Sequence, residues 1–259
     1  VGIETVENMP RIKSLVVTSA RDTAVLNGDD PLCMAMVDQV TAEHVCLVTL
    51  EPDNGAVADH IKAGGRAARL EDAEAGPVLA LYEDGDRSLV MAANDIPAAF
   101  GGAARHNIQN ALFAAAMAHA MGRMLDDIRA GLTGFQCSQD TIPGRANLFD
   151  DLPFKVLVDF AHNPGAFDSI GRMAGALADG GRWICVFTSP KDRDDAHLAE
   201  VARVVAGHFD YFICRESAVA RGGASIVAAK LRDALTGLGI ADEHIAVIPQ
   251  EDEAIMAGL

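Results

Sequence analysis

Short apolar runs alternate with longer amphipathic stretches along the second half of the chain. The runs predict strands, and the stretches between them predict helices. The predicted strands are 155–160, 183–188, 209–214 and 245–248, and the predicted helices are 164–178, 194–207 and 225–237. Continuous apolar strands that alternate with helices indicate βαβ units and a parallel sheet with right-handed crossovers. Ligands of such sheets bind outside the carboxyl ends of the strands.

The first half has a less regular pattern of short strands and helices. Strands are predicted at 45–50, 78–82 and 88–92. Asp84-Gly85 lies between the last two, and this dipeptide supplies the positive φ values of a tight hairpin turn. The Ala-rich stretch 107–129 predicts one or two helices, with Asn107 as an N-cap.

A polar stretch with glycine and proline separates the two patterns. It contains Gly134, Pro143 and Gly144, and such residues interrupt regular elements. We therefore expect an α/β protein with a first domain over 1–133, a hinge over 134–145 and a second domain over 146–259, and we expect the halves to move about this hinge.

Composition narrows the classes of partner. The 259 residues are 50% hydrophobic and carry 37 acidic against 21 basic side chains, a formal net charge of −16. This balance argues against bulk binding to nucleic acid or to anionic membranes. No apolar run approaches the roughly 18 residues of a membrane span. The five scattered cysteines are typical of reduced thiols, so we expect a cytoplasmic protein. The chain begins at Val1 in mid-pattern, as a piece of a longer protein would.

Several common nucleotide and hydrolase motifs are absent from the sequence. No GxGxxG follows a predicted strand, no GxxxxGK[ST] phosphate loop is present, and no GxSxG occurs. Dinucleotide oxidoreductase and serine hydrolase chemistry are thus unsupported, and the chain cannot hold a triphosphate with a phosphate loop of its own.

Three polar segments lie where predicted elements begin or end. DFAHNP (159–164) ends a strand and opens a helix, PGR (143–145) lies in the hinge, and RHNIQN (105–110) opens the Ala-rich helix. Each has an ordinary interpretation as a cap, a turn or a solvated helix start. Each also has a functional one: a carboxylate for ribose, an arginine for phosphate, and an amide for adenine.

In this order and spacing the segments resemble the Mur ligase superfamily of ATP-dependent amide-forming ligases. The resemblance rests on a lysine, VLNGDDP, HNIQN, PGR and DFAHNP, here Lys13, 25–31, 106–110, 143–145 and 159–164. The sequence is most similar to the branch formed by the ligase portion of cyanophycin synthetases. That similarity is carried by PGRANLFD (143–150), SPKDRDD (189–195) and RES…RGG (215–223).

The resemblance implies the second part of a Mur ligase central domain, followed by a Rossmann-like parallel-sheet C-terminal domain. The phosphate loop would lie upstream of Val1, so we expect this chain alone to lack ligase activity. The implied reaction activates a carboxylate as an acyl phosphate with ATP and Mg²⁺ and couples it to an amino acid. In the cyanophycin branch arginine is added to an aspartate side chain, so the acceptor would be a cyanophycin chain or a peptide. A homo-oligomer is compatible with the sequence.

The resemblance also implies roles for individual residues. Lys13, as a carbamate, would lie beside magnesium, and His162 and Asn163 would lie near the reacting groups. The residues implied to contact ATP are His106, Asn107, Asn110, Arg145 and Asp159, and those implied to contact the incoming amino acid are Asp192 and Arg193. Gly28 replaces a usual Ala, and Phe160 replaces a usual Tyr.

Two alternatives remain at this stage. The chain could be a non-catalytic nucleotide-binding or assembly module without a phosphate loop, or a piece of another Mur-type or folylpolyglutamate-type ligase. A GTxGKT stretch encoded upstream of Val1 would favour the catalytic interpretation over the module.

Overall fold

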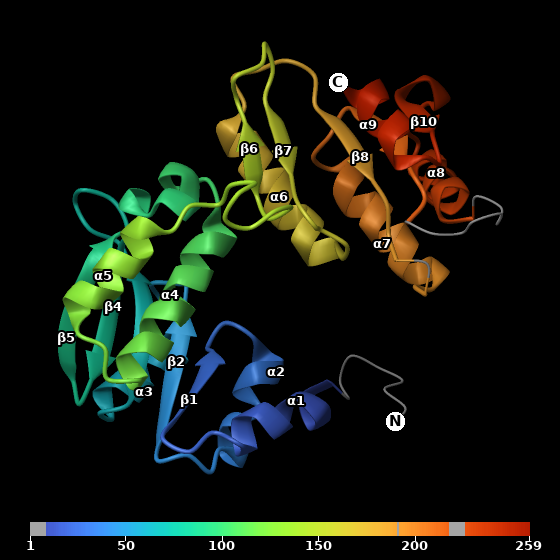
Figure 1. The fold of residues 1–259 in the computed structure, drawn as a ribbon. Coiled ribbons are helices and arrows are strands. Elements are labelled where there is room, and N and C mark those ends of the chain that lie inside the picture. Colours follow the sequence, from blue (N-terminus) through green and yellow to red (C-terminus); the bar gives the residue numbers. More distant parts are fainter. Residues whose placement is uncertain (1–8, 191, 218–225) are drawn as a thin grey trace. The chain divides into compact units, whose positions relative to one another are not determined.

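The chain consists of two compact units, Val1–Gln136 and Cys137–Leu259, which we describe separately. The structure is a computed structural model and describes residues 9–190, 192–217 and 226–259 (Figure 1). The units meet inside the stretch predicted to be a hinge. The movement of this stretch and the assignment of the units to a central and a C-terminal domain stay predictions.

Unit 1 is built on a five-stranded mixed sheet. Its strands are β1 (Thr23–Asn27), β2 (His44–Thr49), β3 (Arg66–Glu71), β4 (Val78–Glu83) and β5 (Asp86–Ala92), in the spatial order β1-β2-β3-β4-β5. The first three strands are parallel, with Thr23 opposite His44, and the last two join antiparallel. The amino ends of β1 and β2 therefore lie together at one edge, and their carboxyl ends lie together at the other.

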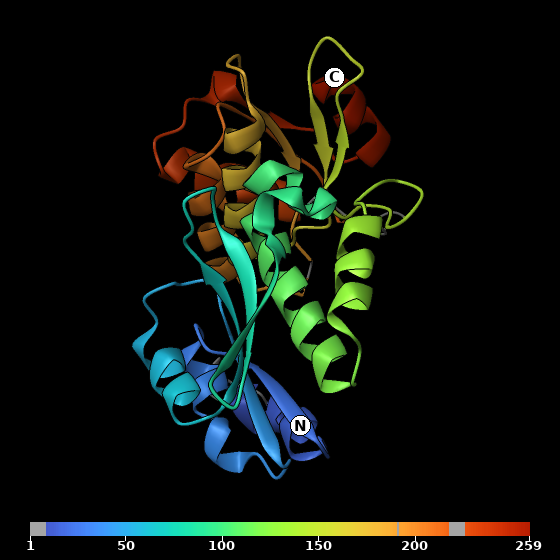
Figure 2. The same cartoon turned by 90° about the vertical axis from the view of Figure 1, so that its left-hand side faces the viewer.

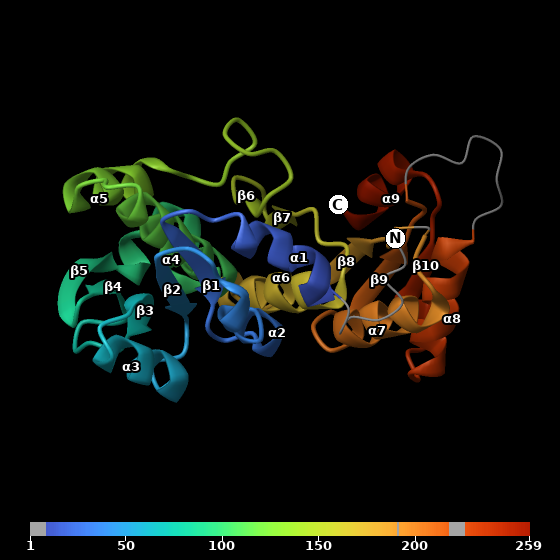
Figure 3. The same cartoon turned by 90° about the horizontal axis from the view of Figure 1, so that it is seen from below.

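Helices cover both faces of this sheet. They are α1 (Met9–Thr18), α2 (Pro31–Met34), α3 (Gly55–Lys62), α4 (Arg105–Ala120) and α5 (Leu125–Gly134), with 3₁₀ turns η2 (Val37–Gln39), η3 (Ala93–Asp95) and η4 (Pro97–Gly102). Figure 3 shows α4 and α5 on one face and α3 on the other. Helix α4 buries Ile108, Leu112 and Ala115, one face at the helical spacing, and it packs against β1, β2 and β3.

Local turn chemistry in unit 1 follows the sequence closely at two places. Asp84 and Gly85 both have positive φ, 51° and 85°, between β4 and β5 (Figure 2). Asp30 caps α2, because its Oδ1 accepts hydrogen bonds from the N–H groups of Leu32 and Cys33. The predicted hairpin is confirmed.

The predicted N-cap at Asn107 is wrong. Helix α4 begins at Arg105 with Ala104 as its cap residue, so Asn107 lies inside the first turn. Its Nδ2 instead donates to the carbonyl oxygen of Ala98 at 2.8 Å, in the preceding η4. The helix therefore starts three residues earlier than a cap at Asn107 would place it.

Unit 2 contains a three-stranded parallel sheet in the order β10-β9-β8. Its strands are β8 (Ile184–Phe187), β9 (Tyr211–Cys214) and β10 (Ile245–Val247), and its helices are α6 (Pro164–Leu177), α7 (Asp195–Ala206), α8 (Val227–Gly237) and α9 (Glu251–Gly258), with the 3₁₀ turn η5 (Asp242–His244). Strands and helices alternate, so the predicted α/β fold class with a parallel sheet is confirmed.

The two faces of this sheet bury different partners. Phe187 and Cys214 are paired in register, and both belong to the core formed with α6, α7 and α8. The neighbouring pair, Val186 and Ile213, points the other way, because strand side chains alternate. A Cβ on Gly258 of α9 would lie only 2.8 Å from Val186 Cγ2, so α9 closes that second face at short range (Figure 3).

The first predicted strand of this half is paired differently from the prediction. The strand expected over 155–160 is shorter, β7 (Val156–Val158), and it pairs antiparallel with β6 (Asn147–Phe149) in a separate two-stranded sheet. A short connection closes this hairpin (Figure 2), and such closure loses less chain entropy than parallel pairing across a helix. Val158 keeps 41% of its surface exposed, as expected of a strand in a small sheet.

Candidate active site

The loop before β6 is held by one buried side chain, Asn147. Its Nδ2 donates to the carbonyl oxygens of Ile142 and Arg145, both at 3.1 Å, and its Oδ1 accepts from the Gly144 N–H at 2.7 Å. Only 1% of Asn147 is exposed. The amide thus uses both its donors and its acceptor to fix the PGR segment from within.

The same loop contains a strained residue. Ala146 has φ 49°, a left-handed conformation that costs a residue with a Cβ about 1–2 kcal/mol. Its N–H donates to Asp159 Oδ2 at 2.9 Å. Conformations of this kind persist where surrounding contacts impose them, and they cluster at functional sites.

Asp159 follows β7 directly and is half-buried. Its Oδ2 is engaged by Ala146, whereas Oδ1 has no hydrogen-bond partner among the described residues. The carboxylate is therefore anchored through one oxygen and retains the other as an acceptor. A group of this kind fits a neutral donor such as a ribose hydroxyl.

Arg145 and His162 flank the exposed ring of Phe160. The Arg145 guanidinium carbon lies 5.0 Å from the ring centroid, and the imidazole of His162 lies 5.4 Å from it at a tilt of 57°. His162 Nδ1 is 3.0 Å from the carbonyl oxygen of Phe160. Stacking holds the exposed guanidinium in place and leaves its N–H donors for an anionic ligand.

Asn163 acts as the N-cap of α6. Its Oδ1 accepts from the Ala166 N–H at 3.0 Å, and Pro164 occupies the first helical position. The structure thus shows Asn163 in the capping role that was the ordinary interpretation of its segment. Its Nδ2 is not used by the cap, so a capping role leaves a donor for a ligand.

The loop after β8 lies at the carboxyl edge of the parallel sheet. Ser189 is fully buried, and its Oγ has no hydrogen-bond partner among the described residues. Asp192 and Arg193 are exposed, and the Arg193 N–H donates to the carbonyl oxygen of Pro190 at 3.2 Å. Asp194 then caps α7 by accepting from the His197 N–H at 2.8 Å.

Residues after β9 reinforce the same edge. The Arg215 N–H donates to the carbonyl oxygen of Phe187, and Arg215 Nη2 lies 3.2 Å from Glu251 Oε1. Glu216 Oε1 accepts from the Ala228 N–H at the start of α8. The later part of the RES…RGG segment (218–223) and Lys191 lie outside the described residues.

The carboxyl edge of the unit 1 sheet has its own polar cluster around Asp29. Asp29 Oδ2 accepts from the Leu50 N–H at 2.7 Å, and its Oδ1 accepts from Asn54 Nδ2 at 2.9 Å and from the Thr49 hydroxyl. Asn54 also caps α3. Asp29 therefore ties β1 to β2 and α3, and both of its oxygens are already engaged.

The adenine-contacting residues expected on α4 lie together. Asn110 Nδ2 donates to Asn107 Oδ1 at 3.2 Å, and His106 precedes them in the same turn. Lys13 is exposed on α1. The expected site residues are thus divided between the units, with Lys13 and the α4 residues on unit 1 and the others on unit 2.

The donor groups of the chain provide a test of the expected cofactors. Asp159 Oδ1 and the Arg145 guanidinium fit a ribose and a phosphate. Magnesium fits less well, because it prefers carboxylate and phosphate oxygens and the Asp29 oxygens are taken. Within the described ranges, only one group of three possible metal-binding side chains is found, Asp22, Glu43 and His44, at the opposite edge of the sheet. We therefore derive no step through magnesium.

Residues 144–259 match the family described as Mur ligase, glutamate ligase domain. The match begins in the PGR loop and covers the described elements of unit 2 from β6 to α9. The resemblance to the Mur ligase superfamily is thus confirmed, and the matched residues make up nearly all of unit 2.

Nearly the whole chain is similar to a cyanophycin synthetase. It is 34% identical over 260 residues to cyanophycin synthetase from Crocosphaera subtropica, which covers 99% of this chain and 29% of that protein. The chain thus spans less than a third of this curated relative. These relatives belong to a family of ATP-dependent amide-forming ligases.

Solved structures show the same fold at lower identity. The UDP-N-acetylmuramoylalanyl-D-glutamyl-2,6-diaminopimelate–D-alanyl-D-alanyl ligase of Acinetobacter baumannii has a TM-score of 0.61 and 19% identity, over 96% of this chain and 47% of that chain. Mycobacterium tuberculosis folylpolyglutamate synthase complexed with ADP has a TM-score of 0.56 and 19% identity, over 84% and 47%. No helix in the described part of this chain is long and apolar enough to cross a membrane.

Two positions were missed by sequence reasoning. Asn147 stood within the quoted PGRANLFD segment, but only its burial and its three hydrogen bonds reveal its role. Asp29 stood within the quoted VLNGDDP segment, beside Asp30, which caps α2. An Asp next to the capping residue, after an apolar strand, was the available signal, since a carboxylate there needs partners.

Proposed function

We propose that this chain supplies the nucleotide-contacting loop and the amino-acid-contacting domain of an ATP-dependent carboxylate–amine ligase. The observation that supports this proposal most directly is the hydrogen bond from the Ala146 N–H to Asp159 Oδ2. It places a half-free carboxylate next to the exposed Arg145. A hydrogen-bond acceptor for ribose hydroxyls and hydrogen-bond donors for phosphate oxygens would thus lie within one segment of the matched domain.

ATP would supply the phosphoryl group that converts a carboxylate substrate into an acyl phosphate. Asp159 accepts hydrogen bonds from the ribose hydroxyls through Oδ1, and its anchored Oδ2 prevents rotation of the carboxylate. Arg145 donates to phosphate oxygens in a fork geometry, which its stacking on Phe160 orients beforehand. The contribution of these residues is positioning and charge stabilisation. His106, Asn107 and Asn110 would contact adenine from α4.

The incoming amine would bind at the loop after β8. We propose arginine as the amino acid and the aspartate side chain of a cyanophycin chain or peptide as the acceptor. The support is the similarity to cyanophycin synthetase over 99% of the chain. An exposed Asp192 carboxylate and the net charge of −16 both favour a cationic substrate. His162 and the unused Nδ2 of Asn163 would lie near the reacting groups.

The test uses the parent polypeptide that carries this chain, assayed for ADP release. Release should require ATP, an acceptor peptide and arginine. Arg145→Gln should lower kcat/KM for ATP by about ten- to a hundredfold, since charge-assisted hydrogen bonds contribute roughly 1.5–3 kcal/mol. Arg182→Gln is the matched control, because Arg182 also stacks on an aromatic ring, that of Tyr211, at 5.5 Å.

Arg182→Gln should remain within about twofold of wild type, as surface substitutions usually do. No ADP release with any amino acid would overturn the ligase proposal. Equal losses in the two arginine variants would overturn the role of Arg145 alone. Release with another amino acid but not with arginine would overturn only the assigned substrate.

A further inference from the structure

A second polar site lies at the edge of the unit 1 sheet opposite Asp29. Asp22 precedes β1, and Glu43 and His44 stand at the start of β2. Parallel pairing in register, with Thr23 opposite His44, brings these two segments together. The amino ends of the strands, not the carboxyl ends expected to face nucleotide, therefore carry this group.

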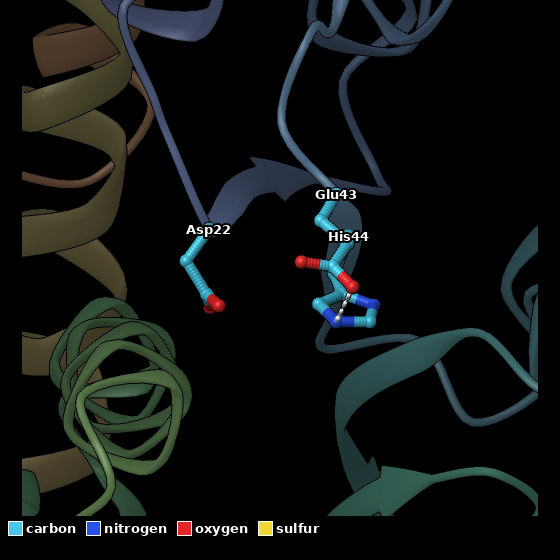
Figure 4. Close-up of side chains that lie close together, drawn as sticks. All are labelled: Asp22, Glu43 and His44. Carbon is cyan, nitrogen blue, oxygen red and sulfur yellow. Dashed lines mark ion pairs between the residues drawn. The ribbon is translucent and has the colours of Figure 1, made fainter.

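Figure 4 shows Glu43 and His44 side by side, with the Asp22 carboxylate across a gap from them. One ligand atom from each of Asp22, Glu43 and His44 lies within 4.8 Å of the others. His44 Nε2 and Glu43 Oε1 are 3.9 Å apart, too far for a hydrogen bond. Two ligands of one zinc ion lie about 3.4 Å apart at metal–ligand distances of about 2.1 Å, so a closure of about half an ångström would bring this pair into coordination.

Neighbouring groups orient Asp22 without using its second oxygen. Asp22 Oδ1 accepts from the Thr23 hydroxyl at 2.6 Å and from Arg66 Nη1 at 3.3 Å. Oδ2 has no partner among the described residues and remains available. The charge of Arg66 is shared with Glu83, whose Oε1 lies 2.6 Å from Arg66 Nη2. Orientation of a metal-binding carboxylate by hydrogen bonds of this kind is common around metal sites.

A cavity of about 290 Å³ opens beside the group. Glu43 and His44 belong to its lining, together with Glu83, Asp84 and Arg66. Three carboxylates against one guanidinium give the cavity an acidic balance that favours a cation. It also gives an ion at its rim access to water or a small ligand.

The other imidazole of the cavity is already committed. His60 Nε2 lies 3.1 Å from the carbonyl oxygens of both Val45 and Arg66. Two acceptors require that Nε2 carry the proton, so this nitrogen cannot bind a metal. A Cβ on Gly65 would lie 2.3 Å from the His60 ring, which fixes the ring against β2 and β3. His44 is the imidazole of the cavity whose ligand atom lies within 4.8 Å of the two carboxylates.

We propose that Asp22, Glu43 and His44 form a binding site for a divalent transition-metal ion such as Zn²⁺. One imidazole nitrogen and two carboxylate oxygens are a donor set that such ions accept, with water in the remaining position. The ion would clamp the start of β1 to the start of β2. This site is independent of the proposed ligase activity, because it uses none of the residues assigned to nucleotide or amino acid.

The test is isothermal titration of the metal-stripped 259-residue chain with Zn²⁺. Saturable binding is expected, and His44→Asn, Glu43→Gln and Asp22→Asn should each weaken it by at least about tenfold, since loss of even a supporting partner costs 10–100-fold. Asp84→Asn is the matched control. It removes one charge from the same cavity but no ligand, and it should change the affinity by less than about twofold.

A spectroscopic readout separates coordination from general attraction. Co²⁺ bound by wild type should give visible absorption bands that His44→Asn and His44→Gln both lack, and Zn²⁺ should raise the Tm of wild type but not of these variants. Circular dichroism without metal verifies that the variants fold. No saturable binding, wild-type affinity in any of the three ligand variants, or an equal loss in Asp84→Asn would overturn the assignment.

Discussion

Asp159 accepts a hydrogen bond from the backbone N–H of Ala146, thirteen positions earlier in the chain, at 2.9 Å. The bond joins the end of β7 to the loop before β6, and Ala146 adopts a left-handed φ of 49° to make it. One oxygen of the carboxylate is thereby fixed and the other is left for a ligand. The position of Arg145 relative to Asp159 follows from the same bond.

The conformation of the loop before β6 depends on Asn147, so replacing Asn147 should lower the free energy of unfolding of unit 2. Asn147→Ala leaves the part-buried N–H of Gly144 and two carbonyl oxygens without their partner, and we expect a loss of about 2–3 kcal/mol. Asn163→Ala, which removes only the cap of α6, should cost about 1 kcal/mol. Urea denaturation of both variants tests this order. A loss for Asn147→Ala no larger than for Asn163→Ala would contradict it.

The substitution Gly28→Ala, which introduces the residue usual in the Mur ligase superfamily, should destabilise this chain. A Cβ at this position would lie 2.6 Å from Val57 Cγ2 and 3.2 Å from the carbonyl oxygen of Val48. Val57 is fully buried, so Gly28→Ala should destabilise the chain by about 1–3 kcal/mol through overpacking.

Val57→Ala removes the methyl groups that a Cβ at Gly28 would meet. Thermal or urea unfolding of the two single variants and the double variant should show a smaller penalty for Gly28→Ala when Val57 is Ala, a coupling of about 0.5–3 kcal/mol. Strictly additive losses would show that Val57 is not the obstacle.

Protonation of Glu71 at acidic pH should lower the free energy of unfolding of unit 1. Burial raises the pKa of Glu71, but hydrogen bonds from Arg87 and Tyr82 outweigh it, so the pKa lies below its usual value of 4.5. A depressed carboxyl pKa contributes stability above the unfolded-state pKa, and that contribution is lost as the pH falls through the folded-state pKa.

The pH dependence of unfolding tests this. The free energy of unfolding of wild type should fall between about pH 5 and pH 3, and Glu71→Gln should be less stable at pH 7 with a shallower decline over that range. Asp86→Asn, in the same hairpin, is a control that should leave the slope unchanged. Parallel pH profiles for wild type and Glu71→Gln would contradict the prediction.

Much of the fold follows from hydrophobic spacing. The parallel strands β8, β9 and β10 lie within two residues of the predicted apolar runs, because the strands of a parallel sheet covered by helices are continuously apolar. The hairpin turn at Asp84-Gly85 follows from the positive φ that Gly tolerates. These features depend on local sequence alone.

The partner of β7 depends on more than local sequence. An apolar run of this length is compatible with a parallel or an antiparallel neighbour, and the choice of β6 rests on chain closure across the hairpin. The helix start at Arg105 likewise depends on a contact between Asn107 and Ala98. Asn147 could not be distinguished from a turn residue until its burial was known.

The candidate site could be predicted as a set of residues, but its geometry could not. Order and spacing of motifs led to Arg145, Asp159, His162 and Asn163, and the structure gathers these within one end of unit 2. Asn163 also caps α6, which agrees with the ordinary interpretation of its segment. The hydrogen bond from Ala146 to one Asp159 oxygen could not be predicted from the sequence pattern.

The measurement that tests the central claim most directly is the KM for ATP of Asp159→Asn in the parent enzyme, with Asp151→Asn in the exposed β6–β7 connection as control. The asparagine oxygen can still accept from Ala146, so the fold should persist with little change in Tm. Its amide would then present a donor to the ribose hydroxyls. We expect KM for ATP to rise about ten- to a hundredfold and Asp151→Asn to behave as wild type. Wild-type ATP kinetics in Asp159→Asn with unchanged Tm would contradict a nucleotide-binding role for this carboxylate.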